Sequence, residues 1–278
     1  MSNYLHGNLW TSPLLTFVAM SLIVSCATVP HTGRKQLNFL PDKDLDALGA
    51  RSYSELLVRE PSCNDSKINE AVKRVAKRVS AAAEELDHPG FDWKIHVVDR
   101  DIPNAFCLPG GKIVVYTGIL PYVKNEAGLA TIIGHEIAHA VARHGGERLS
   151  QQVAIQGISS VGSEIFKDEA GKLDNKTKAI IGALGLGATI GVLLPYSRTH
   201  EMEADRIGQL YMAKAGYDPL ESIRLWERMA KINKPPIPVW LSTHPADQDR
   251  IQNLIKLLPE AQKLYIKALP KYGLGTAL

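Results

Sequence analysis

The chain has 278 residues, of which 45% are hydrophobic and 22% are charged, and its 32 basic and 29 acidic side chains leave a formal net charge of +3. This much apolar material is enough for one sizeable core, so a disordered chain is excluded, and the small net charge gives no indication of a nucleic-acid partner. Three cysteines are too few for a disulfide scaffold.

The N-terminus has an unusual charge pattern, because residues 1–33 contain no Asp, Glu, Lys or Arg. The apolar run Leu14 to Val24 is shorter than the roughly 20 residues of a membrane-spanning helix and fits the apolar core of a secretory signal. Residues 22–26, Leu-Ile-Val-Ser-Cys, resemble a bacterial lipobox, although no Lys or Arg precedes the apolar run. We predict a lipoprotein signal peptide over residues 1–25 and lipidation of Cys26. The alternative is a buried N-terminal helix with a core cysteine.

A polar segment over residues 27–38 is predicted to be a tether, and helices are predicted over about 41–58 and 66–85. In the second helix, apolar residues recur at three- and four-residue steps from Ile68 to Leu86. Its other face carries a basic stripe, made of Lys73, Arg74, Lys77 and Arg78. We predict that this stripe is a solvated face, with contact to anionic lipid as the alternative.

The apolar period then changes to that of β-strands. Residues 93–98 alternate, and residues 105–108 and 112–116 flank a Pro-Gly-Gly turn, which predicts a β-hairpin. Helical patterns follow over about 125–144, 147–166, 177–194, 198–214, 218–231 and 246–258. Asp218, before Pro219, is expected to cap the fifth of these helices. The sequence therefore predicts an α+β fold that is dominated by helices and has one small sheet early in the chain.

Within the helical segment 177–194, residues 179–194 contain no charged residue and four glycines. It is short for a membrane span. We predict either a buried helix or a mobile flap that touches a membrane, with a membrane span as the lesser alternative.

The chemistry of the chain is concentrated in residues 135–139, which read His-Glu-Ile-Ala-His. Positions i and i+4 lie on one helix face, so His135 and His139 can bind one metal ion. Glu136 can then serve as general base toward the water that the metal activates. A catalytic zinc usually takes a third ligand from the protein.

Two residues are candidates for the third ligand. His144 has the wrong spacing for the extended metzincin pattern, and we expect it at a helix end, where a cation meets the C-terminal dipole. Glu201 and Asp205 are four residues apart on another predicted helix. Glu201 can complete the metal site, while Asp205 can accept the outer N–H of a ligand histidine. Glu203 is expected in solvent on another face of that helix.

Four motifs occur in order along the chain, at residues 104–111, 135–139, 198–205 and 242–245. Together they resemble the HtpX-like family of zinc metallopeptidases, gluzincins that include the CAAX prenyl protease and the mitochondrial Oma-type protease. The resemblance is strongest to the lipid-anchored or periplasmic BepA/LoiP-type quality-control proteases. It implies a gluzincin domain over residues 65–258, with one Zn²⁺ bound by His135, His139 and Glu201 and with Glu136 as the base.

The last motif, Ser242-Thr243-His244-Pro245, supplies a further candidate catalytic residue. His244 is predicted to donate to the oxyanion of the reaction or to act as a latch over the open metal position, and Arg250 is a weaker candidate donor. The alternative is that His244 only begins the following helix. A substrate is expected to add as an extended strand beside the hairpin, which favours unfolded chains.

The sequence therefore predicts a zinc endopeptidase of the bacterial cell envelope that acts on misfolded or mistargeted envelope and outer-membrane proteins. We expect it to be lipid-anchored, to face the periplasm and to reside at the outer membrane, because the residue after Cys26 is Ala27 and not the Asp associated with inner-membrane retention. One alternative is a lipoprotein chaperone or assembly factor for outer-membrane proteins with a latent metal site, and another is a metal hydrolase for other substrates.

The predicted organisation has four parts: a signal peptide over 1–25, a tether and N-terminal helix over 26–64, the metallopeptidase domain over 65–258, and a tail over 259–278. Cys63 and Cys107 would share an oxidising compartment. They are expected either to form a disulfide or to be two separate small apolar side chains.

Overall fold

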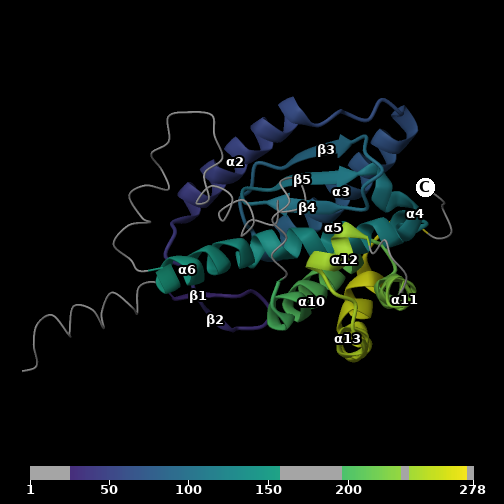
Figure 1. Cartoon of the computed structure of the whole chain (residues 1–278). Coiled ribbons are helices and arrows are strands. Elements are labelled where there is room, and N and C mark those ends of the chain that lie inside the picture. Colours follow the sequence, from purple (N-terminus) through teal and green to yellow (C-terminus); the bar gives the residue numbers. More distant parts are fainter. Residues whose placement is uncertain (1–25, 157–195, 233–237, 274–278) are drawn as a thin grey trace, which may run out of the picture.

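A computed structural model describes residues 26–156, 196–232 and 238–273 (Figure 1). The predicted signal peptide, the uncharged segment 179–194 and the end of the helix predicted over 147–166 lie outside the described residues. Helices surround a small three-stranded sheet in the part that is described, which confirms the predicted α+β class.

The sheet has the strand order β3-β5-β4. Its strands are β3 (Lys94–Val98), β4 (Ala105–Leu108) and β5 (Lys112–Tyr116). The predicted hairpin is confirmed, because β4 pairs antiparallel with β5, whereas β3 pairs with β5 in parallel. Gly110 and Gly111 have φ angles of +72° and +79°, a conformation that favours glycine. In the order β3-β5-β4, strand β4 lies at an edge of the sheet.

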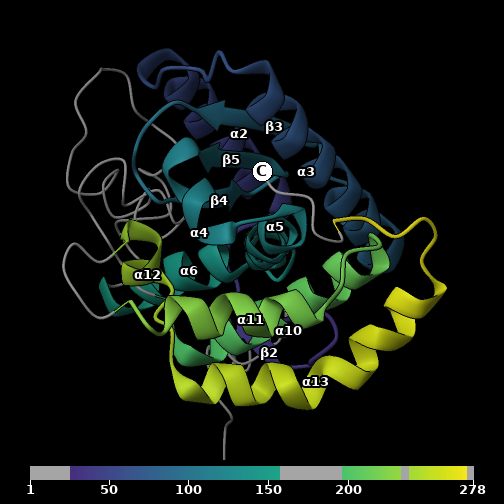
Figure 2. The ribbon, with the colours of Figure 1, turned by 90° about the vertical axis from the view of Figure 1, so that its right-hand side faces the viewer.

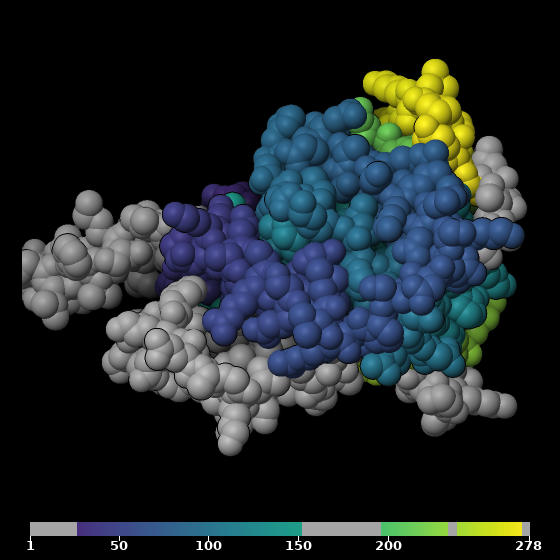
Figure 3. Space-filling view, turned by 90° about the horizontal axis from the view of Figure 1, so that it is seen from above, coloured from purple at the N-terminus to yellow at the C-terminus, as the bar shows by residue number. Residues whose placement is uncertain are grey.

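The sheet lies between helices (Figure 1). Helix α2 (Asp42–Arg59) covers one face of it and the central helix α5 (Glu126–Val141) the other, while α3 (Ser66–Asp87) packs against α5. Seen from above, the purple-to-blue segments that include α2 and α3 make up much of the visible face (Figure 3). Every residue of α5 is buried, as expected of a helix that is surrounded by other elements.

A second group of helices lies on the other side of α5 (Figure 2). It consists of α10 (Arg198–Lys214), α11 (Leu220–Met229) and α13 (Gln248–Lys267). The remaining short elements are η1 (Thr117–Ile119), α4 (Leu120–Val123) and α12 (Val239–Thr243). The predicted capping by Asp218 is met in part: its Oδ1 atom accepts a hydrogen bond of 3.0 Å from the backbone N–H of Leu220, but α11 begins at Leu220 and Pro219 is its N-cap residue.

The central helix ends earlier than predicted. The side chain of Asn125 caps its start by accepting a 2.8 Å hydrogen bond from Gly128 N–H. Its end lies at Val141, because Arg143 adopts a left-handed conformation with φ of +59° and turns the chain. His144 is therefore the first residue of α6 (His144–Gln156) and not the last of α5.

The tether predicted over residues 27–38 is wrong, because part of this segment forms a β-ribbon. The strands β1 (Cys26–Thr28) and β2 (Lys35–Leu37) form an antiparallel ribbon. Gln36 is 3% exposed, and its Nε2 atom donates a 2.9 Å hydrogen bond to the carbonyl oxygen of Ala142. The polar composition suggested a solvated linker, but two of its polar side chains, Arg34 and Gln36, have buried partners.

The predicted C-terminal tail also begins too early. Helix α13 continues through Pro259 to Lys267, although proline disfavours a helix interior. Beyond the proline, Ala261 is buried and packs in a cluster with Leu210 and Ala213 of α10. This packing holds the last two turns of the helix in place.

The basic stripe of α3 is only partly solvated. Arg74 Nη2 lies 2.5 Å from Oε1 of the buried Glu126, and Arg78 Nη1 lies 3.1 Å from the hydroxyl of Tyr217. The first contact ties α3 to the start of α5, and the second ties it to the segment between α10 and α11.

Cys63 and Cys107 are both buried and both free, so the disulfide alternative is not realised in this structure. Within the ranges that the structure describes, no helix combines the length and the apolar character needed to cross a membrane.

Candidate metal centre

Two glycines bring the helices of the centre together. A Cβ atom on Gly208 of α10 would lie 2.7 Å from the backbone nitrogen of His135 in α5, and one on Gly134 would lie 2.8 Å from the carbonyl oxygen of Gly208. Only glycine permits this approach of the two backbones. Two turns before Gly208, Glu201 reaches the histidines of α5.

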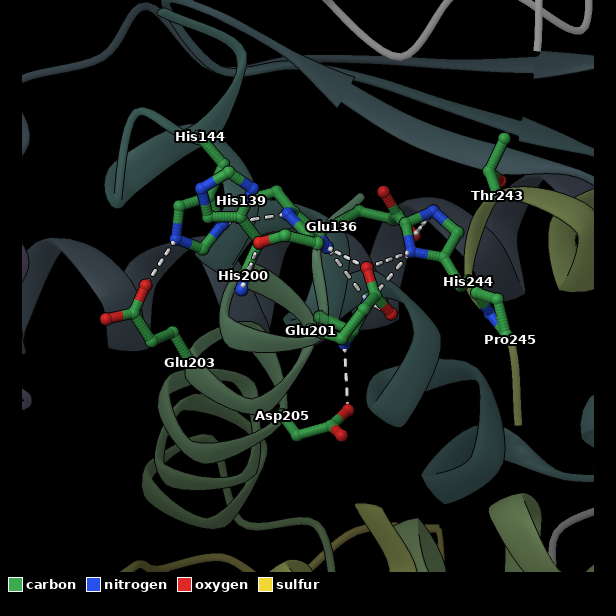
Figure 4. Close-up of polar contacts among 12 residues, drawn as sticks. Glu136, His139, His144, His200, Glu201, Glu203, Asp205, Thr243, His244 and Pro245 are labelled. Atoms are coloured by element: carbon green, nitrogen blue, oxygen red, sulfur yellow. Dashed lines mark hydrogen bonds and ion pairs between the residues drawn. The ribbon is translucent and has the colours of Figure 1, made fainter. Parts of the chain in front are cut away.

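Four buried side chains place one donor atom each within 4.8 Å of one another: His135, His139, Glu201 and His244. The Nε2 atoms of His135 and His139 are 3.0 Å apart. Glu201 Oε1 lies 3.3 Å from His139 Nε2, and Glu201 Oε2 lies 3.4 Å from His135 Nε2. Figure 4 shows the carboxylate of Glu201 in contact with His244.

These distances fit a bound zinc ion. Ligand atoms about 2.1 Å from a tetrahedral zinc lie about 3.4 Å from one another, and imidazole nitrogens with a carboxylate are a usual ligand set. The two Nε2 atoms face one another and a carboxylate inside the protein. A cation at their common centre would satisfy all of them, so His135, His139 and Glu201 are suited to hold zinc.

The outer face of His135 is held by a carboxylate, as the sequence suggested for Asp205. His135 Nδ1 lies 3.0 Å from Asp205 Oδ1. Burial would lower the pKa of His135, but the carboxylates of Glu201 and Asp205 raise it to about 9. Arg250 binds both oxygens of Asp205 at 2.7 Å and also lies 2.7 Å from Glu201 Oε2. Its guanidinium is therefore occupied by carboxylates, which contradicts the expectation that it donates to an oxyanion.

The outer face of His139 is held by a second histidine. His144 Nδ1 lies 2.9 Å from His139 Nδ1, and His144 Nε2 lies 3.1 Å from Glu203 Oε2 (Figure 4). Two expectations are wrong here. His144 is fully buried at the start of α6, where burial lowers its pKa to about 4, so it is not a cation at a helix end. Glu203 is not in solvent, because it is only 6% exposed.

An arginine of the N-terminal ribbon completes this side of the centre. Arg34 binds Glu203 through Nε at 2.8 Å and Nη2 at 2.9 Å, and it binds Glu147 at 2.8 and 2.7 Å. Glu147 in turn accepts a 2.9 Å hydrogen bond from His200 Nε2. Burial would raise the pKa of Glu203, but the hydrogen bonds from His144 and Arg34 lower it to about 2. No sequence pattern pointed to Arg34, although it is the first charged residue of the chain.

The predicted base, Glu136, is oriented by a helix that the sequence did not predict. Trp240 of α12 donates from Nε1 to Glu136 Oε1 at 2.7 Å, and His244 Nε2 lies 3.5 Å from the same oxygen. The alternative that His244 only begins the next helix does not agree with the structure. Asp247 caps α13 by accepting from Arg250 N–H at 2.9 Å, while the His244 ring points toward the metal ligands.

A cavity of about 250 Å³ borders the centre. Its lining includes His139, Cys107 at the edge strand β4, and Tyr196, whose ring stacks on His139 with the centroids 4.0 Å apart. An extended chain beside β4 would pass close to the metal ligands.

Comparison with known proteins identifies the same region. The model of peptidase family M48 matches residues 66–258. The chain is 39% identical over 244 residues to the mitochondrial metalloendopeptidase OMA1 of Schizosaccharomyces pombe, a match that covers 84% of this chain and 67% of that protein. It is 33% identical over 248 residues to the human mitochondrial metalloendopeptidase OMA1, covering 84% of this chain and 46% of the relative.

Similarity also extends to bacterial proteins. The putative beta-barrel assembly-enhancing protease of Vibrio cholerae is 34% identical over 221 residues, covering 75% of this chain and 43% of that protein. The chain therefore spans about half the length of several of the relatives that it matches.

Proposed function

Because this chain belongs to peptidase family M48, we propose that it hydrolyses internal peptide bonds of misfolded or mistargeted membrane and envelope proteins. The match confirms the family that the motifs predicted, and with it a metallopeptidase that uses zinc. The observation that carries the proposal is the convergence of His135, His139 and Glu201 beside Glu136 in one buried centre.

In this proposal, different residues of the centre bind the metal and transfer the proton. When bound, zinc supplies a Lewis acid that makes a water molecule acidic and polarises the scissile carbonyl group. His135, His139 and Glu201 would hold it. Trp240 fixes one carboxylate oxygen of Glu136, and the other oxygen accepts the proton of the attacking water and passes it to the leaving amine.

His244 has a separate role in the proposal, that of a latch. Its Nδ1 atom lies 3.2 Å from His135 Nε2 and 2.9 Å from Glu201 Oε1, where it can serve as a fourth metal ligand. A centre with four protein ligands leaves no position for water. If the His244 ring moved away from the other ligands, it could instead donate a hydrogen bond to the developing oxyanion of the substrate.

This closed arrangement also favours the second candidate function. A chain whose latch stays closed would be a chaperone or assembly factor with a latent metal site. The beta-barrel assembly-enhancing relatives of bacteria, by their name, combine a protease with an assembly function.

The test is the degradation of an unfolded substrate such as casein. We expect the wild-type protein to degrade it, a chelator to stop the reaction, and Glu136→Gln to lower kcat by at least about a hundredfold, because the general base is lost. Glu136→Gln should still bind one equivalent of zinc. Equal degradation by Glu136→Gln and wild type would contradict the mechanism, whereas zinc binding without degradation by either protein would support the chaperone.

We further propose that the protein is anchored to the outer membrane through a lipid on Cys26 and faces the periplasm. The relatives come from mitochondria and from bacteria, so this part of the proposal depends on the apolar run Leu14 to Val24 and on the lipobox-like residues 22–26. Membrane proteins that fail to assemble would then lie within reach of the centre.

Anchoring predicts metabolic labelling by a fatty acid. In a bacterial host, the wild-type protein should incorporate labelled palmitate and fractionate with the membrane. Cys26→Ala should lose the label, whereas Cys63→Ala, which changes a cysteine in the core, should keep it. Unchanged labelling of Cys26→Ala would exclude this cysteine as the anchor.

A further inference from the structure

The N-terminal ribbon contributes a side chain to the support of the metal centre. Arg34 lies between β1 and β2, and its guanidinium forms two hydrogen bonds to Glu203 and two to Glu147, at 2.7 to 2.9 Å. The two carboxylates are almost fully buried, and Arg34 itself is 26% exposed. A planar guanidinium suits such paired contacts because its N–H groups form a rigid fork.

Arg34 is connected to the candidate metal ligand His139 through Glu203 and His144. With the Nε2 atom of His139 at the metal, its Nδ1 carries the proton and donates to His144 Nδ1 at 2.9 Å. The Nε2 of His144 must then carry its proton and donate to Glu203 Oε2 at 3.1 Å. The ionised Glu203 therefore fixes both rings, and it can remain ionised in the interior because Arg34 compensates its charge.

The other ligand histidine shows the same arrangement. His135 Nδ1 lies 3.0 Å from Asp205 Oδ1, and Asp205 is held by Arg250 through two contacts of 2.7 Å. Each ligand histidine is therefore linked to a carboxylate, His135 directly and His139 through His144. In both cases an arginine binds that carboxylate with two N–H groups. The two arginines differ in origin, because Arg250 lies in α13, whereas Arg34 comes from the ribbon that precedes every helix among the described residues.

Hydrogen bonds hold the ribbon against α5 and α6, so that Arg34 is kept beside Glu203 and Glu147. Gln36 donates from Nε2 to the carbonyl oxygen of Ala142, at the turn between α5 and α6, at 2.9 Å. The backbone N–H of Phe39 donates to Ser150 Oγ in α6, also at 2.9 Å. The ribbon is consequently anchored on both sides of the turn that carries His144.

From these contacts we propose that Arg34 is a positioning residue of the metal centre, acting on His139 through Glu203 and His144. This inference rests on the proposed metal site and deepens it, because it makes the ribbon before residue 65 part of the metallopeptidase. Arg34 touches neither the metal ligands nor the cavity beside them.

Zinc affinity of the full-length protein, measured by competition with a chromophoric chelator, tests the proposal. Supporting groups outside the ligands change metal affinity by about 10- to 100-fold, so we expect Arg34→Ala to raise the zinc Kd by that factor. Arg34→Lys keeps the charge but not the fork, and it should recover only part of the affinity. Lys35→Ala, which removes the neighbouring lysine from the same ribbon, should bind zinc as the wild type does.

The cobalt-substituted protein gives a readout that a purely structural role would not change. Arg34→Ala should shift the visible absorption of bound Co²⁺, since the orientation of His139 changes, and Lys35→Ala should not. In the Glu203→Gln background, Arg34→Ala should have little further effect on zinc affinity, because the charge that Arg34 compensates is already absent.

The outcomes separate the inference from the proposed function. If the wild type binds no zinc, the metal site and this inference both fail. If the wild type binds zinc and a folded Arg34→Ala or Arg34→Lys protein binds it within about twofold of the wild type, with an unchanged cobalt spectrum, only the role of Arg34 is overturned. If Arg34→Ala does not fold, Arg34→Lys and Glu203→Gln decide the question by the same measurements.

Discussion

At the scale of single residues, the charges around the candidate metal centre are balanced within the protein interior. Arg250 is 2% exposed, contacts Asp205 and Glu201, and lies 3.6 Å from the centroid of the Trp226 ring. Its loss would remove an arginine counter-charge from two buried carboxylates. Breaking a buried ion pair from one side costs about 3–5 kcal/mol.

We therefore predict that Arg250→Met lowers the free energy of unfolding of the zinc-free protein by about 3–5 kcal/mol, measured by urea denaturation. Arg206→Met is the matched control, because Arg206 binds the half-exposed Glu260 at 2.9 Å and such a pair contributes less than about 1 kcal/mol. An effect of Arg250→Met below about 1 kcal/mol, as small as that expected for the control, would contradict the stabilising role of Arg250.

The ligand residues could be predicted from the sequence, whereas the residues that hold them could not. His135, Glu136, His139, Glu201 and Asp205 lie at helical spacings, and two such pairs on different helices can be read without a structure. Arg34, His144 and Glu203 have no such pattern. Their contacts depend on the left-handed turn at Arg143 and on the docking of a ribbon that is distant in sequence.

At the scale of elements, local signals predicted the hairpin and most helices well. The strands β4 and β5 begin and end at the predicted residues, because the Pro-Gly-Gly turn fixes the register between them. Helix α10 also has the predicted bounds, and Ser197 caps it by accepting from His200 N–H at 3.2 Å. Capping and turn chemistry act within a few residues, so the sequence reveals them directly.

Elements whose bounds depend on distant packing were mispredicted. Helix α13 passes through Pro259 because Ala261 packs against α10, and the ribbon forms because Gln36 finds a carbonyl partner at Ala142. The five-residue helix α12 has too few residues for an apolar period. Nevertheless it carries Trp240 and leads to His244, so this short element controls the orientation of the predicted base.

At the scale of the whole molecule, the centre joins segments that are far apart in the chain. Its donor atoms come from α5, from α10 and from the residue after α12, at positions 135, 139, 201 and 244. The ribbon packs against the α5–α6 turn from the opposite end of the sequence. Zinc that binds this assembled centre but not the unfolded chain would stabilise the fold as a whole.

We predict that zinc removal by a chelator lowers Tm substantially. At a free zinc concentration about a thousandfold above Kd, the stabilisation is about 4 kcal/mol, which for a chain of this size corresponds to roughly 10 °C. Calorimetry of the wild type with zinc and with chelator measures this difference. Glu201→Gln, which weakens a ligand, should shrink the difference, while Glu136→Gln should keep it, because the base is not a ligand. If Glu136→Gln loses the zinc-dependent stabilisation and Glu201→Gln retains it, then Glu136 is the ligand and Glu201 is not.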